Sequence, residues 1–178
     1  VAPAEAGTAA PHVARLRNGF IVVWQARDGG GAGIFAQRYT FTGKPRGSRI
    51  SVNDRTRGPQ TRPRVAGLAN GGFVVTWQTP DGSGPGIAKR RFTAAGRPVG
   101  PEEQVNIETS RRQSNPDVAV LSNGNYVITW TSMVAPRQFN VMARVFRRNG
   151  RPATQERIVD DRRQAWAARA VVAPRAAG

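Results

Sequence analysis

The chain has 178 residues, no cysteine, one histidine and a formal net charge of +16 at pH 7. The lack of cysteine excludes disulfides, thiolate metal sites and cysteine nucleophiles, and a single histidine leaves little material for a zinc site or a Ser-His-Asp triad. We expect that histidine, His12, to be a surface residue. The length suits one well-cored domain, and no apolar run approaches the roughly 20 residues of a membrane helix.

The strongest pattern is a phrase repeated three times around a tryptophan. Trp24, Trp77 and Trp130 are each 53 residues apart and lie in NGFIVVWQ, NGGFVVTWQ and NGNYVITWT. A period near 50 residues is typical of a propeller, solenoid or array, in which a copied unit buries its apolar face against its neighbours. Such an architecture favours binding or scaffolding over a one-off active site.

Each repeat begins with a predicted Pro-x-Val-Ala-x-Leu strand and passes through an Asn-Gly turn into the strand that carries the tryptophan. Asn-Gly between apolar runs indicates a hairpin, because both residues tolerate positive φ. In the first Trp strand Phe20, Val22 and Trp24 share one face, and Ile21 and Val23 make the other face apolar as well. We therefore expect these strands to be buried on both faces and the three tryptophans to be core residues. The first strands are predicted at 11–16, 63–68 and 116–121.

A glycine-rich loop and two further strands complete each repeat. The third strands are predicted at 34–39, 87–92 and 141–146, and the last at 50–53, 103–106 and 157–160. The loop holds Asp28 in the first repeat and Asp81 in the second, and these are weak candidates for calcium ligands. Calcium takes about six to eight oxygens and each loop offers one carboxylate, so we expect a plain tight turn and no cofactor.

Four short antiparallel strands in about fifty residues match the size of a propeller blade. The sequence predicts one all-β repeat domain over 1–178, with three full β-propeller-like units and partial units at both ends. Fewer than about four blades do not normally close a ring. Self-association, excision from a longer array and an open stack are the alternatives, and we favour self-association. The units are a trailing strand and connector at 1–10, repeats at 11–62, 63–115 and 116–167, and a partial repeat at 168–178.

The second repeat, PRVAGLANGGFVVTWQTPDGSGPGIAKRRFTAAGRPVGPEEQVN, resembles the roughly 50-residue β-repeat of large secreted bacterial surface proteins, which are often RTX-like and exported by type I systems. The resemblance covers nearly the whole chain and is closest in this repeat. It implies an exported, non-catalytic, adhesion-like protein. Members of that family are typically acidic, whereas this chain is strongly basic and has no nonapeptide calcium repeat.

Arginine dominates the positive charge, and its planar guanidinium suits bidentate contacts with phosphate, sulfate or carboxylate. Arginines recur in the connectors between repeats and as doublets on or near strands, and Trp166 lies outside the repeat register as an exposed or interface aromatic. The predicted polyanion- or partner-binding residues are Arg57, Arg90, Arg91, Arg111, Arg112, Arg147, Arg148, Arg162, Arg163 and Trp166.

Carboxylates suited to acid–base catalysis are scarce. The adjacent pairs are Glu102–Glu103 and Asp160–Asp161, and neighbours on a strand point to opposite faces, so neither pair makes a natural dyad. With 11 acids among 27 bases, we expect most acids to lie in ion pairs. We predict no enzyme activity and no catalytic residue.

The sequence thus favours a non-catalytic structural or adhesive module that is secreted, periplasmic or on the cell surface of a bacterium. We expect it to form a homo-oligomer or dock on a larger assembly through its arginines, with an acidic protein or glycan as partner. The alternatives are a lectin-like propeller that binds acidic glycans and a general polyanion-binding module. Nucleic acid is a less favoured partner, because no recognised motif is present.

Overall fold

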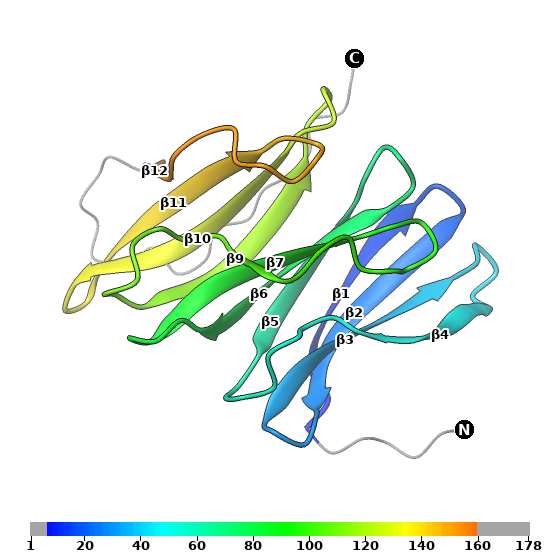
Figure 1. Cartoon of the computed structure of the whole chain (residues 1–178), viewed down its shortest axis with the longest axis horizontal. Coiled ribbons are helices and arrows are strands. Elements are labelled where there is room, and N and C mark those ends of the chain that lie inside the picture. Colours follow the sequence, from blue (N-terminus) through cyan, green and yellow to red (C-terminus); the bar gives the residue numbers. More distant parts are fainter. Residues whose placement is uncertain (1–6, 160–178) are drawn as a thin grey trace.

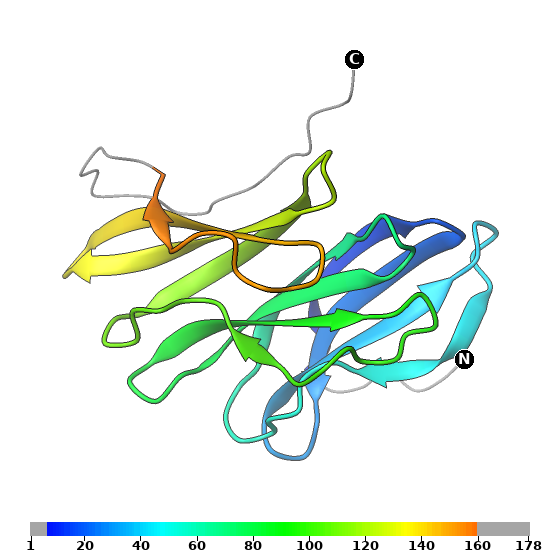
Figure 2. The same ribbon diagram turned by 45° about the horizontal axis from the view of Figure 1, so that its top comes forward.

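The structure is a computed structural model that describes residues 7–159. These residues form three separate four-stranded antiparallel sheets and no helix, which confirms the all-β, blade-like prediction. No helix in this range is therefore long and apolar enough to cross a membrane. The three sheets, here called blades 1, 2 and 3, lie in a row in sequence order, with blade 2 between the others (Figures 1 and 2).

Each blade is a simple meander in which strands consecutive in sequence are neighbours in the sheet. Blade 1 contains β1 (Ala9–Leu16), β2 (Gly19–Arg27), β3 (Ala32–Tyr39) and β4 (Pro45–Ser51). Blade 2 contains β5 (Thr61–Gly67), β6 (Phe73–Pro80), β7 (Pro85–Phe92) and β8 (Glu103–Gln104). Blade 3 contains β9 (Gln113–Val120), β10 (Tyr126–Ala135), β11 (Gln138–Phe146) and β12 (Arg157–Ile158). The first strand, β1, begins two residues earlier than predicted.

The predicted hairpin turns are present, but only one of their two residues is left-handed. Gly71 and Gly124 have φ of 83° and 79°, whereas Asn70 and Asn123 do not have positive φ. The asparagines act through their side chains instead, since Asn70 Oδ1 accepts a hydrogen bond of 3.0 Å from the amide of Gly72. In blades 2 and 3 the turn is longer than the two-residue turn that Asn-Gly usually indicates, whereas blade 1 has a two-residue turn made by Arg17 and Asn18.

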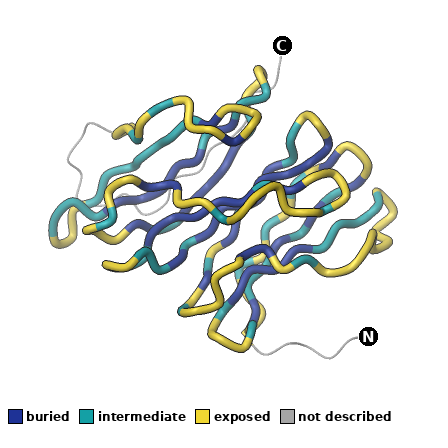
Figure 3. The backbone as a smooth tube through the Cα atoms, viewed as in Figure 1, coloured by how far each residue is buried: buried dark blue, intermediate teal, exposed yellow. Residues whose placement is uncertain are grey.

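Apolar side chains fill the two spaces between blades. One cluster joins Ile21 and Val23 of blade 1 to Phe73, Val75 and Trp77 of blade 2. A second cluster joins the opposite face of blade 2 to blade 3, where Tyr126, Ile128 and Trp130 are the counterparts of the same three residues. Both faces of β6 are buried, as predicted (Figure 3).

Trp24 departs from the predicted core. Trp77 and Trp130 are 0% and 1% exposed, but Trp24 is only half-buried, as are Phe20 and Val22 beside it. The reason is positional: these residues lie on the face of blade 1 that points away from blade 2, and no blade among residues 7–159 packs on that face.

The blades converge on their first strands. Strands β1, β5 and β9, here called the inner strands, contact one another from blade to blade, whereas the fourth strands β4, β8 and β12 are largely exposed. This is the arrangement of propeller blades around an axis. The approach is closest at Gly67, where an added Cβ would lie 2.3 Å from the carbonyl oxygen of Arg15.

Gly67→Ala is expected to lower the free energy of unfolding by about 1–3 kcal/mol, because the new methyl group forces β1 and β5 apart. The matched control is Gly84→Ala, whose Cβ meets only Arg112 Cγ at 3.9 Å. Both changes reduce the entropy of the unfolded chain equally, so their difference in urea unfolding isolates the clash. Equal stability of the two variants would contradict the close approach.

Candidate functional site

The inner strands of all three blades line a hollow of about 470 Å³, here called the axial hollow. Its wall is mostly aliphatic and small, with a few charged or titratable side chains, which is the usual make-up of a ligand site. The lining residues are His12, Val13, Ala14 and Arg15 from β1, Val65, Ala66 and Gly67 from β5, and Asp117, Val118, Ala119 and Val120 from β9.

One repeat position supplies much of the chemical variety near this hollow. In the pattern Pro-x-Val-Ala the second residue is His12 in blade 1, Arg64 in blade 2 and Asp117 in blade 3. The flanking proline, valine and alanine are identical in the three repeats. Thus a constant framework presents a base, a cation and an acid at equivalent points of the inner strands.

The inner strands are irregular just before this position. Ala10, Arg62 and Asn115, each directly before the proline, have φ of 51°, 55° and 53°. Left-handed backbone is costly for residues other than glycine, and more so before proline. The pairing register shifts at the same place in every inner strand, as in a β-bulge. Bulges of this kind often re-aim side chains beside functional sites.

A polar chain crosses the three blades at these bulges. The amide of Arg62 donates to Gln25 Oε1 of blade 1 at 3.1 Å, and its guanidinium donates to Asn115 Oδ1 of blade 3. His12 also bridges two blades, since its Nδ1 accepts a 3.3 Å hydrogen bond from the amide of Val65. His12 is half-buried and not the free surface residue that the sequence suggested.

Asp117 is the carboxylate of the axial hollow among the described residues. It is 6% exposed, and its Oδ1 accepts a 2.9 Å hydrogen bond from the amide of Val118. With His12 and Arg15 in the same wall, the hollow combines a carboxylate, an imidazole and a guanidinium. These groups can hold hydroxyl-rich ligands by hydrogen bonds and can transfer protons. Sequence analysis missed Asp117, although comparing the repeats residue by residue would have singled it out.

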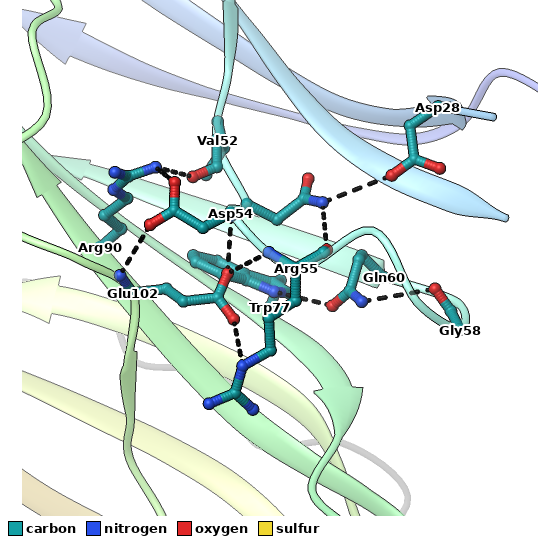
Figure 4. A network of polar contacts seen from close by, with 10 residues as sticks. Asp28, Val52, Asp54, Arg55, Gly58, Gln60, Trp77, Arg90 and Glu102 are labelled. Carbon is teal, nitrogen blue, oxygen red and sulfur yellow. Dashed lines mark hydrogen bonds and ion pairs between the residues drawn. The ribbon is translucent and has the colours of Figure 1, made fainter. Parts of the chain in front are cut away.

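The arginine surface predicted from the sequence is partly internal. Arg90 is 8% exposed, and its Nη1 lies 2.6 Å from Asp54 Oδ1 and 3.0 Å from the carbonyl oxygen of Val52. It therefore joins blade 2 to the connector after blade 1 (Figure 4). Arg91 donates to the carbonyl oxygen of Arg148 at 3.1 Å and thereby joins blades 2 and 3. Burial and these bonds commit both residues to blade packing.

Of the other predicted binding residues, Arg148 contacts Arg91 through its carbonyl oxygen. Arg148 also lines a groove of about 420 Å³ between the turns of blades 2 and 3. Two arginines and the fourth tryptophan lie outside the described residues: Arg162, Arg163 and Trp166. Exposed on the described part are Arg57, Arg111, Arg112, Arg147 and Arg148.

The adjacent glutamates act in two different packing contacts, as expected from their opposite directions. Glu102 Oε2 accepts from the amide of Asp54 at 2.8 Å, and its Oε1 lies 3.1 Å from Arg55 Nε (Figure 4). Glu103 forms a 2.9 Å ion pair with the buried Lys89. Neither carboxylate faces the axial hollow.

The two calcium candidates stabilise their own loops. Asp28 Oδ1 accepts from the amide of Gly30 at 3.0 Å, and Asp81 Oδ2 accepts from Asn106 Nδ2 at 3.0 Å. Asn106 in turn accepts from the amide of Ile87 at 2.8 Å, so an asparagine just after the last strand links this loop to the third strand, β7, and Asn53 makes the equivalent bonds in blade 1. Among residues 7–159 no group of three metal-ligating side chains is found.

A buried hydrogen bond joins the indole of Trp77 to the connector between blades 1 and 2. Trp77 Nε1 donates to Gln60 Oε1 at 3.2 Å, and Gln60 is fully buried (Figure 4). The buried indole N–H thereby finds the partner that it needs. The sequence shows Gln60 only as a polar residue of a connector. Its burial and its bond to Trp77 depend on how the blades pack, so the sequence alone does not predict them.

Comparisons with known proteins give a fold and no family. No protein-family model matches the chain, and no curated protein matches it. An endo-arabinase from Bacteroides thetaiotaomicron has 11% identity and a TM-score of 0.59, over 85% of this chain and 62% of that one. A GH43 endo-arabinanase from Bacillus licheniformis has 13% identity and a TM-score of 0.53, over 86% and 59%. A thermostable family-43 glycoside hydrolase has 13% identity and a TM-score of 0.55, over 78% and 50%.

These likenesses show a β-propeller-like fold; the neighbours have five blades, and the chain spans only 50% to 62% of the length of these three proteins. They correct the predicted function. We expected a non-catalytic adhesive, lectin-like or polyanion-binding module and no enzyme, because a repeated unit argued against a one-off site. The three similar structures named above are glycoside hydrolases or arabinan-degrading enzymes, and this finding contradicts those predictions. The secreted location and the kinship with secreted surface repeats stay predictions.

Arg90→Gln is expected to lower the free energy of unfolding by about 3 kcal/mol, because it leaves Asp54 and a buried carbonyl without their cation. Arg147→Gln, at an exposed arginine, should change it by less than about 0.5 kcal/mol. Urea titration of both variants measures the contrast. If Arg90→Gln is as stable as the wild type, the contact between blades 1 and 2 does not depend on this arginine.

The stability of the chain is also expected to depend on Lys89 at high pH. Burial lowers the pKa of Lys89, with Glu103 opposing the shift. The folded state therefore releases this proton at a lower pH than the unfolded state, whose lysine titrates near 10.5, and stability rises with pH in that window.

In Lys89→Met this contribution is absent. The free energy of unfolding of the wild type should therefore rise relative to that of Lys89→Met as the pH climbs from neutrality toward 10.5. Comparing the two proteins cancels the titration of groups they share. A difference that stays constant with pH would contradict the depressed pKa.

Proposed function

We propose that the chain acts on carbohydrate, as a three-blade part of a glycoside-hydrolase-type propeller, with the sugar bound at the axial hollow. The observation that carries the proposal is the position after the inner-strand proline. It holds His12 and Asp117 at the wall of the hollow, and Arg64 in blade 2, which does not line the hollow, while the framework around this position is unchanged. A site built at the axis by inner strands needs this combination of a constant scaffold and locally different chemistry.

The chemistry of glycoside hydrolysis gives Asp117 its role. Hydrolysis of a glycosidic bond generally uses two carboxyl groups, one as general acid and the other as base or nucleophile. Asp117 supplies one carboxylate at the wall of the hollow. The half-buried His12 and the exposed Arg15 supply hydrogen bonds that orient sugar hydroxyl groups. The shared fold of the arabinan-degrading enzymes supports a polysaccharide as substrate.

The test is to incubate the purified 178-residue protein with debranched arabinan or β-1,2-mannan oligosaccharides and to measure the reducing sugar released from these substrates. Asp117→Asn keeps the size and the acceptor oxygen of the side chain, and should reduce the rate by about 100-fold or more. Asp28→Asn, which changes an acid of a distant loop, should leave the rate unchanged.

Thermal melting of both variants checks that they fold. A folded Asp117→Asn protein with the wild-type rate would overturn the role of Asp117. If the wild-type chain neither binds nor cleaves any of these glycans, the proposed function is wrong.

A further inference from the structure

A second hollow lies between blades 1 and 2, at the end of the sheets where β1 turns into β2. Its volume is about 370 Å³, and it shares no lining residue with the axial hollow. Three arginines of blade 1 line it, namely Arg17, Arg38 and Arg46, and no acidic residue does so among the described residues. We call it the arginine groove.

The positive charge of this groove has no acid to balance it. Arg38 and Arg46 are direct partners in the pairing of β3 with β4, and like charges at opposed positions of antiparallel strands are destabilising. Burial lowers the pKa of Arg38, and the nearby charge of Arg46 lowers it further. Within residues 7–159 none of the three arginines forms an ion pair, whereas Arg55, Lys89 and Arg90 do.

Backbone carbonyls hold two of these guanidinium groups in place. Arg38 Nη1 donates to the carbonyl oxygen of Ala94 in blade 2 at 2.7 Å, and Arg46 Nη1 donates to that of Asn18 at 2.8 Å. A guanidinium has five N–H donors, so one such bond fixes the group and leaves donors for a ligand. A ligand that binds between the two groups therefore meets cations that are already ordered.

Comparison of the blades shows that two of the arginines are not needed by the scaffold. The groove between blades 2 and 3 has the same position in the repeat and a volume of about 420 Å³, yet it lacks this charge. The counterparts of Arg17 are Ala69 and Ser122, and those of Arg46 are Val99 and Ala153.

Arg38 differs from the other two arginines because the repeat retains it. Its counterpart Arg91 bonds to blade 3 in the same way that Arg38 bonds to blade 2. Arg38 therefore has a packing role in addition to its place in the groove. Arg17 and Arg46 have no such counterpart, so their charge is specific to the arginine groove.

We propose that the arginine groove binds the phosphate group of a small phosphate monoester, with Arg17, Arg38 and Arg46 as the phosphate ligands. Guanidinium groups bind phosphate through paired hydrogen bonds, and a phosphate monoester carries close to two negative charges at neutral pH. The groove has the volume of a small-molecule site and more room than phosphate alone needs. Leu16 and Tyr39 in its wall provide surface for the organic part.

The first experiment is calorimetric titration of the protein with phenyl phosphate and with inorganic phosphate, in a buffer free of other oxyanions. We expect one site per chain and tighter binding of phenyl phosphate, because its ring adds contacts to Leu16 and Tyr39. Equal affinities would show that the site takes the free ion and would overturn the monoester. The absence of saturable binding at millimolar concentrations would overturn the site itself.

A double variant tests the ligands without disturbing the blade contact. Arg17→Ala with Arg46→Val installs the residues that blade 2 carries at these positions and leaves Arg38 intact. The affinity for phenyl phosphate should fall by about 10-fold or more, since two charged donors are lost. The control, Arg57→Gln with Arg147→Gln, removes two positive charges from exposed positions elsewhere and should bind as the wild type does. An equal loss in both double variants would show attraction to the net charge and no defined site.

The converse experiment builds a second site. Ala69→Arg with Val99→Arg places two arginines beside Arg91 and so repeats the constellation in the groove between blades 2 and 3. Ala69 and Val99 are exposed, so both positions have room for the longer side chain. Two phosphate monoesters should then bind per chain. A stoichiometry that stays at one would overturn the assignment of these three positions as the phosphate ligands.

Discussion

A four-stranded sheet with two apolar faces cannot bury both of them by itself, and this constraint organises the whole molecule. Blade 2 meets it fully, with Phe73, Val75 and Trp77 on one side and Val74 on the other all removed from water. Among residues 7–159, blades 1 and 3 pack against another blade on one side only. The order of blades and the closeness of the inner strands follow from this need.

Charged residues take part in the same packing, which changes the meaning of the net charge of +16. Arg90 and Arg144 both donate to backbone carbonyls of the blade or connector before them, at 3.0 and 2.7 Å. Glutamates at repeated positions accept from connector amides. Blades that meet mainly through aliphatic groups could slide, whereas these directional bonds fix how one sheet sits on the next. Some of the arginines therefore serve to hold neighbouring blades together.

The period of 53 residues and the alternation along the Trp strands were enough to predict the blades, because both depend on local spacing. The sequence could not assign Arg90 or Gln60, since their burial depends on which blade edge meets which connector. Trp24 was misplaced for a related reason: its strand has the pattern of a core strand, and only the position of blade 1 at an end leaves it half-buried. Asp117 was missed because a repeat search rewards what the copies share and passes over the position where they differ.

In each inner strand, some positions serve packing and one position varies in its chemistry. Proline, valine and alanine hold its place against the next blade, while the single residue between proline and valine has taken three unrelated forms, in His12, Arg64 and Asp117. Duplication of a blade thus copies a stable scaffold together with one replaceable slot beside the axis. A protein built in this way can vary the chemistry beside its axis by exchanging one residue per blade, and the number of such positions grows with the number of blades.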